Sequence, residues 1–182
     1  MKVFLTGGTG FVGSEVLRQL VSAGHSVRAL VREGSEDKLT VTAGVEIHPG
    51  DISDAASLVG GPEGCDAVIH LVGIIREFPG RGVTFKKMHV LGTENVLKAA
   101  EEQGVSRYLH MSSNGTRESS NTGYHRTKWQ AEEFVRNSNL EWTIFRPSLI
   151  FAQGSEFVHM LSEVIRRLPD VPVIGNGQYR MQ

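Results

Sequence analysis

Short apolar runs alternate with segments of helical periodicity along most of the chain. The apolar runs, which predict β-strands, occupy residues 3–5, 27–31, 45–48, 66–72, 105–111 and 142–145. Between and after them, apolar residues recur at helical spacing and predict helices over about 12–23, 55–58, 84–102, 124–137 and 156–168, the last ended by Pro169 and Pro172. This alternation is typical of a mostly parallel sheet with helices on both faces. We therefore expect a doubly wound α/β fold.

A glycine-rich turn joins the first predicted strand to the first predicted helix. Residues 6–13 read TGGTGFVG. Gly7 allows a tight turn, Gly10 lets the backbone approach a pyrophosphate, and Gly13 lets the helix pack closely on the strand. The phosphates would face the positive end of the helix. The turn therefore predicts the opening of a Rossmann-type dinucleotide-binding unit, with an ordinary strand-turn-helix as the alternative.

The ends of the next two strands bear on the choice of cofactor. An acidic residue after the second strand would bind the ribose hydroxyls of NAD, but Arg32 stands there. Arg32 can pair with a 2′-phosphate, which favours NADP over NAD. A solvated surface arginine is the alternative, since Glu33 and Asp37 follow closely. After the third strand, Asp51 is placed to accept a hydrogen bond from the adenine amine, and Ile52 to pack on the ring. Asp51 can equally cap the short helix that follows, as Ser53 or Asp54 can.

The fourth predicted strand leads toward the reacting end of a bound cofactor. Gly73 ends this strand, and an uncluttered backbone there leaves room for the nicotinamide ribose and pyrophosphate. His70 interrupts the apolar run, and we interpret it as a hydrogen-bonded core residue rather than a catalyst. The polar loop 74–82 that follows is expected to cover substrate.

A tyrosine and a lysine supply the candidate chemistry. Tyr124 and Lys128 are separated by one helical turn, so their side chains lie on the same helix face. A tyrosine phenol ordinarily titrates at about pH 10. A nearby cation favours the phenolate, which a proton-transferring tyrosine requires. Lys128 can also reach ribose hydroxyls of the cofactor, and Ser113, after the fifth strand, can hold a substrate carbonyl or alcohol.

Composition excludes several other classes. The chain has 182 residues and a net charge of -1, so no basic field indicates nucleic acid or an anionic membrane as a partner. The single cysteine, Cys65, excludes an internal disulfide and fits a reducing compartment. No apolar stretch is long enough to span a bilayer, and the chain enters a strand at once, so we expect a cytoplasmic protein without membrane insertion or a targeting peptide. The histidines lack metal-ligand spacing, so no metal is expected.

Several segments together resemble a known family. They are TGGTGFVG, ALVR, GDISD, DAVIHLVG, HVLGTEN, RYLHMSS, YHRTK and WTIFRPSLIF, and they extend over essentially the whole chain. The chain resembles the short-chain dehydrogenase/reductase superfamily in its extended or atypical branch. Within that branch it is most similar to the NAD-dependent epimerase/dehydratase group, and there to proteins like the 39 kDa subunit of respiratory complex I.

The resemblance implies roles for individual residues. Ser113, Tyr124 and Lys128 match the family's Ser-Tyr-Lys positions, and the fourth member of its tetrad, usually an asparagine, falls at His89, which can donate a hydrogen bond to backbone or water. The full set of expected cofactor contacts, from the residues and from the resemblance together, is Gly7, Thr9, Gly10, Phe11, Val12, Gly13, Arg32, Asp51, Ile52, Leu71, Val72, Gly73, His89, Met111, Tyr124, Lys128, Pro147 and Ile150.

These expectations define a domain plan and two functions. An NAD(P)-binding domain is expected over 1–147, and the start of a substrate-binding region, incomplete in this chain, over 148–182. The leading function is hydride transfer between NADP and a small carbonyl or alcohol substrate, or related epimerase/dehydratase chemistry. The alternative is an NADP-binding protein without turnover that serves in structure, redox sensing or assembly of a respiratory complex. The family also implies a homodimer, paired through the helices predicted at 84–102 and 124–137.

Overall fold

The computed structural model describes residues 1–152, 155–168 and 176. The chain divides into two units, Met1–Arg146 and a second one that begins at Pro147. Pro169 and Pro172, which we expect to end the last helix, lie outside the described residues. The second unit contains α4 (Glu156–Arg167). None of the helices in the described ranges is long and apolar enough to cross a membrane.

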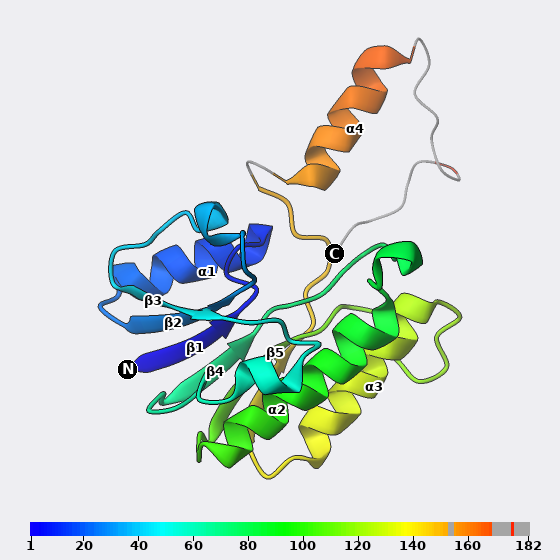
Figure 1. The fold of residues 1–182 in the computed structure, drawn as a ribbon. Helices are drawn as coiled ribbons and strands as arrows, with labels where there is room; N and C mark the ends of the chain where they lie inside the picture. Colours follow the sequence, from blue (N-terminus) through cyan, green and yellow to red (C-terminus); the bar gives the residue numbers. More distant parts are fainter. Residues whose placement is uncertain (153–154, 169–175, 177–182) are drawn as a thin grey trace. The chain divides into compact units, whose positions relative to one another are not determined.

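The first unit is built on one parallel sheet (Figure 1). Within the described residues its strands are β1 (Lys2–Thr6), β2 (Ser26–Val31), β3 (Val45–Pro49), β4 (Ala67–His70), β5 (Arg107–Met111) and β6 (Glu141–Phe145), in the order β3-β2-β1-β4-β5-β6. Every neighbouring pair is parallel. The doubly wound α/β prediction is therefore confirmed. The strand order reverses between β1 and β4, which is where such sheets bind ligands.

Helices cover both faces of this sheet (Figure 1). They are α1 (Phe11–Ser22), α2 (Gly92–Glu102) and α3 (Gly123–Asn137), with short turns η1 (Glu36–Lys38), η2 (Ala55–Leu58), η3 (Pro79–Arg81) and η4 (Lys86–Leu91). Two predictions need correction. The expected helix at 55–58 is a 3-10 turn, and the expected regular helix over 84–102 begins with the π-helical turn η4. The other elements begin and end within two residues of their predicted bounds.

The alternation of side chains along β1 explains the two layers. Phe4 and Leu5 are both fully buried, but adjacent residues of a strand point to opposite faces of the sheet. Phe4 joins a core cluster with Val96 of α2, whereas Leu5 joins a second cluster with Leu17 of α1. A fully apolar strand is therefore required at the centre of the sheet.

Candidate functional site

The glycine-rich turn lies at the carboxyl end of β1 and leads directly into α1. The Gly10 amide donates a hydrogen bond to the Gly7 carbonyl at 3.0 Å. A Cβ atom at Gly13 would lie 1.9 Å from the same carbonyl oxygen, so the first turn of α1 packs here only because residue 13 is glycine. The remaining residues of this turn that we expect to contact the cofactor are Thr9 and Val12, both half-buried, and Phe11, which is 39% exposed.

The turn meets the chain that follows β4, at the point where the strand order reverses. A Cβ atom at Gly7 would lie 3.2 Å from the carbonyl carbon of Leu71 and from the amide nitrogen of Val72. Two of the backbone segments that we expect to contact the pyrophosphate and nicotinamide ribose are therefore adjacent. This cradle of backbone, which side chains at its glycines would fill, fits a dinucleotide.

Asp51 has two predicted roles, adenine binding and capping of the short helix that follows, and the structure contradicts the second. The Asp51 carboxylate accepts hydrogen bonds from the Ser53 amide at 2.8 Å and the Ser53 hydroxyl at 2.7 Å. The cap of η2 is Asp54, whose carboxylate accepts from the Ala56 amide, so the alternative that Asp51 caps this turn is wrong.

Ile52 and Arg32 differ in their surroundings. Ile52 is buried, and its side chain packs against Gly92 of α2, so little of it is exposed to meet an adenine ring. Arg32 follows β2 and is exposed, and within the described ranges its guanidinium forms no ion pair. The contacts of both residues with a cofactor stay predictions.

Lys128 is the most unusual charged residue of the site. Its side chain is 3% exposed, and its ammonium donates a hydrogen bond to the Met111 carbonyl, at the end of β5, at 2.9 Å. The ammonium also lies 2.9 Å from the position that a Cβ atom would take at Gly73, so it lies against the backbone that follows β4. Burial lowers the pKa of Lys128 to about 8, against the opposing charge of Glu132.

Tyr124 lies at the start of α3 among other rings. Its ring is half-buried and meets Phe85, His89 and His125 edge to face, with centroid distances of 5.8, 5.4 and 5.1 Å. Among the described residues, no hydrogen bond joins Tyr124 to Lys128. Both residues lie on α3 one turn apart, and Lys128 reaches the carboxyl end of β5.

His89 connects three segments around this tyrosine. Its Nδ1 lies 2.9 Å from the Thr127 hydroxyl, and its Nε2 lies 3.1 Å from both the amide nitrogen and the carbonyl oxygen of Ile74. The Thr127 hydroxyl donates to the Gly123 carbonyl at 2.8 Å. It therefore accepts from Nδ1–H, and Nε2 is left to accept from the Ile74 amide. Burial, together with the charge of Lys128, lowers the pKa of His89 to about 3, so the ring is neutral.

His70 is a hydrogen-bonded core residue, as we interpret it from the sequence. Its Nδ1 lies 2.7 Å from the Thr6 hydroxyl and its Nε2 lies 3.2 Å from the Thr93 hydroxyl. Burial, followed by the charges of Lys128 and His89, lowers the pKa of His70 to about 3. The prediction is confirmed.

The remaining residues expected in the site come from other parts of the chain. Ser113 follows β5 and is half-buried, and its hydroxyl donates to the Asn114 carbonyl at 3.4 Å. No hydrogen bond among the described residues joins Ser113 to Tyr124. Pro147 and Ile150 belong to the second unit, so their expected contact with the nicotinamide stays a prediction. In the described ranges, no group of three or more His, Cys, Asp or Glu side chains is arranged to hold a metal ion.

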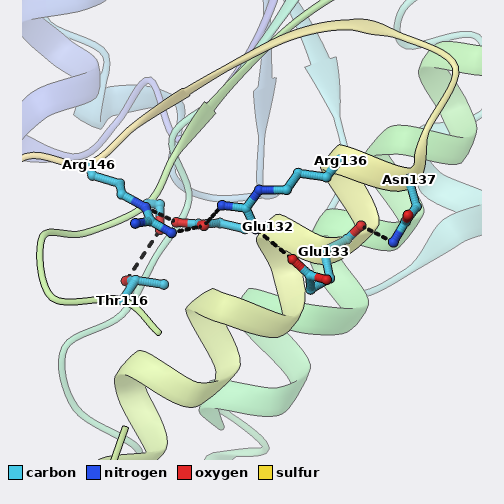
Figure 2. A network of polar contacts seen from close by, with 7 residues as sticks. Thr116, Glu132, Glu133, Arg136, Asn137 and Arg146 are labelled. Atoms are coloured by element: carbon cyan, nitrogen blue, oxygen red, sulfur yellow. Dashed lines mark hydrogen bonds and ion pairs between the residues drawn. The ribbon is translucent and has the colours of Figure 1, made fainter. Parts of the chain in front are cut away.

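Sequence reasoning missed a buried ionic network beside the site (Figure 2). The carboxylate of Glu132, fully buried on α3, accepts from the Arg146 guanidinium at 2.8 and 2.5 Å and from Arg136. Burial alone would raise the pKa of Glu132, but hydrogen bonds from Arg146, Ser112 and Arg136 outweigh it and hold this pKa below its usual range. The guanidinium groups of both arginines also lie over the Trp129 ring. The spacing of Lys128, Glu132 and Arg136 on one helix face was the available signal.

Comparison with known proteins identifies the class. Residues 7–160 match the family described as NAD(P)H-binding, and the chain belongs to that family. The match agrees with the glycine cradle and the parallel sheet described above. The chain thus contains an NAD(P)-binding domain with a Rossmann-type fold.

Individual relatives refine this picture. The chain is 30% identical over 186 residues to a 4-hydroxy-2-methyl-3-oxo-4-farnesyl-3,4-dihydroquinoline-1-oxide ketoreductase of Stigmatella aurantiaca, covering 91% of this chain and 55% of that protein. It is 31% identical over 183 residues to NADH dehydrogenase [ubiquinone] 1 alpha subcomplex subunit 9 of Arabidopsis thaliana, covering 97% of this chain and 45% of that protein. The resemblance drawn from the motifs is confirmed. The chain spans about half the length of these relatives.

A solved structure has the same fold. The Bordetella bronchiseptica enzyme WbmH, in complex with NAD+, superposes with a TM-score of 0.76 at 22% identity, covering 91% of this chain and 62% of that chain. At this identity the similarity concerns the fold alone.

Proposed function

We propose that this chain is the cofactor-binding part of an NADP-preferring oxidoreductase or epimerase/dehydratase-like enzyme acting on a small carbonyl or alcohol. Tyr124 transfers the proton to or from the substrate oxygen, Ser113 orients that oxygen, and Lys128 stabilises the tyrosinate and binds the ribose of the cofactor. NADP, when bound, supplies or accepts the hydride.

The observation that carries this proposal is the buried ammonium of Lys128. It lies beside Gly73, where the sheet brings the predicted nicotinamide path together with the face of α3 that presents Tyr124. Burying an ammonium there costs desolvation, which the hydrogen bond to the Met111 carbonyl and the nearby charge of Glu132 offset only in part. Placing a cation at this cost is understandable if it binds cofactor hydroxyls and favours a phenolate nearby.

The preference for NADP rests on Arg32. Its guanidinium is exposed at the end of β2 and has no ion-pair partner in the described part of the chain, so it is free to pair with a 2′-phosphate. The family and the relatives support only NAD(P). The discrimination is therefore our inference from this residue.

A second candidate function is NADP binding without turnover, with a role in a respiratory complex. The similarity to the Arabidopsis thaliana complex I subunit favours it. The separation of Ser113 from Tyr124 in the hydrogen-bond network also fits a site that has no need to react. We place this function second because the serine, tyrosine and lysine are all present at the expected helix and strand ends.

The variant Tyr124→Phe separates the two functions. We expect NADPH oxidation with a panel of small aldehydes and ketones to fall about 100-fold or more, with NADPH affinity little changed. Tyr108→Phe is the matched control, because the buried Tyr108 hydroxyl has no hydrogen-bond partner in the described residues. Wild-type protein that binds NADPH but reduces no member of the panel would favour the second candidate.

A further inference from the structure

The segment between β4 and α2 is strongly cationic. It carries Arg76, Arg81, Lys86 and Lys87 but only one carboxylate, Glu77, in a chain whose net charge is -1. All four cations are exposed, and none has an ion-pair partner in the described ranges. The Glu77 carboxylate is used otherwise, since it accepts a hydrogen bond from the Phe85 amide at 2.7 Å. The segment therefore carries an excess of positive charge.

This segment has a defined shape that gathers the cations. The amide and carbonyl of Phe78 pair with Val83, so the chain between them forms a closed loop around η3. The guanidinium groups of Arg76 and Arg81 lie 5.5 and 6.0 Å from the centroid of the Phe78 ring. The Lys87 ammonium folds back to within 3.9 Å of the position of a Cβ atom at Gly82. Three like charges are thus collected around one loop.

Gathering these cations around one loop is electrostatically unfavourable. Like charges repel, and Lys86 and Lys87 stand in the first turn of a helix, whose amino end is already positive. Local rules of this kind are broken mostly at functional sites. An anion bound between the guanidinium groups would remove the repulsion, and the planar fork of arginine suits carboxylate and phosphate.

The loop also borders the proposed reaction site. Phe85, held by Glu77, meets the Tyr124 ring edge to face at 5.8 Å and stacks on His89 at 5.4 Å. In the sequence, Arg76 and Arg81 precede Phe85, whose ring contacts Tyr124, and Lys86 and Lys87 follow it. A substrate that reaches Tyr124 with its carbonyl can place another group at this loop.

We propose that Arg76 and Arg81 bind an anionic group of the substrate, a carboxylate or a phosphate, while its carbonyl lies at Tyr124. The substrate class is then an anionic carbonyl compound or alcohol, and cation-π attraction to the Phe78 ring favours the position of both guanidinium groups. The position of the carbonyl rests on the proposed function, whereas the anion site itself does not.

The test uses matched charged and neutral probes on the NADPH-loaded chain. Calorimetry measures binding of benzoate and phenyl phosphate, with benzamide as the neutral probe. NADPH oxidation is measured in parallel with 4-carboxybenzaldehyde, 4-formylphenyl phosphate and methyl 4-formylbenzoate. We expect the anionic probes to be preferred and the double variant Arg76→Gln/Arg81→Gln to lose about tenfold or more of that preference. The control Lys38→Gln/Lys98→Gln removes two charges elsewhere and should keep it.

The outcomes separate the anion site from the reaction. Anion binding that the arginine variant loses supports the site, even if no aldehyde is reduced, and in that case the proposed reaction alone fails. Equal binding and turnover of charged and neutral probes overturns the anion site and leaves the proposed reaction standing. Arginine-dependent binding to phosphatidylglycerol vesicles without discrimination among the small probes would also overturn it, by assigning the loop to a membrane surface.

Discussion

Two opposite charges are buried about one turn apart on the same helix, and they differ in their ion-pair partners. Glu132 is fully buried, and the guanidinium groups of Arg136 and Arg146 satisfy both of its oxygens. Lys128 is 3% exposed, and its ammonium has the Met111 carbonyl but, in the described part of the chain, no ion pair with a carboxylate. The pKa of Glu132 is accordingly held below its usual range, whereas that of Lys128 falls to about 8.

The difference separates a structural ion from a functional one. A compensated buried ion joins elements of the fold, in this case α3 and the end of β6, where Arg146 stands. The charge of Glu132 one turn away acts on Lys128 but does not outweigh the cost of burying its ammonium, and such costs are usually accepted at functional sites. We therefore expect substitution of the two residues to change stability in opposite directions.

Removal of the carboxylate should have the largest effect. Glu132→Gln leaves two guanidinium groups without their buried partner, and we expect the free energy of unfolding to fall by about 3–5 kcal/mol. Glu133→Gln is the matched control, since the Glu133 side chain is 46% exposed and pairs with Arg136 at 2.7 Å, and it should cost less than about 1 kcal/mol. Urea unfolding followed by circular dichroism measures both. Equal losses in the two variants would contradict a special role for Glu132.

Removal of the ammonium should act in the opposite direction. Lys128→Met replaces a buried cation with an apolar chain of similar length, and we expect the free energy of unfolding at pH 7 to rise by about 2 kcal/mol. NADPH affinity should fall by about tenfold or more, because the hydrogen bonds to the ribose are lost. Urea unfolding measures the change in stability, and a fluorescence titration measures the change in NADPH affinity. A variant that is less stable than wild type would place Lys128 with the structural ions.

A pH series sharpens the comparison with a smaller effect. The pKa of Lys128 is about 8 in the folded chain and 10.5 ordinarily, so between these values the unfolded chain binds more protons than the folded one. The wild-type free energy of unfolding should therefore rise with pH in this window, relative to Lys128→Met, by at most about 1.4 kcal/mol per pH unit. Parallel stability curves for the two proteins between pH 8 and 10.5 would show that Lys128 has an ordinary pKa.

The order of strands and helices followed from the sequence because the inner parallel strands β1, β2, β4 and β5 are mostly buried and read as apolar runs, whereas β3 and β6 at the sheet edges are more exposed. The run 66–72 is an example, and even its histidine, His70, was interpreted correctly, since a polar residue in such a strand needs hydrogen-bond partners. The π-helical turn Lys86–Leu91 was not predictable, because Phe85 and Met88 also fit the period of a regular helix.

The site was predictable where its parts are close in sequence. Tyr124 and Lys128 share a helix face, and the turn at Gly13 signals its own geometry. The contacts that depend on tertiary packing were missed. Arg146 reaches Glu132 from another element. His89 is neutral because it is buried near Lys128, and it accepts from the Ile74 amide because Thr127 of α3 accepts from its other ring nitrogen.

The most direct test of this account is an equilibrium titration of the chain with NADPH and NADH, followed by cofactor fluorescence, for wild type, Lys128→Met and Arg32→Ala. The account predicts tighter binding of NADPH than of NADH, loss of affinity for both in Lys128→Met, and loss for NADPH alone in Arg32→Ala. Equal affinity of wild type for the two cofactors, or unchanged binding in Lys128→Met, would contradict it.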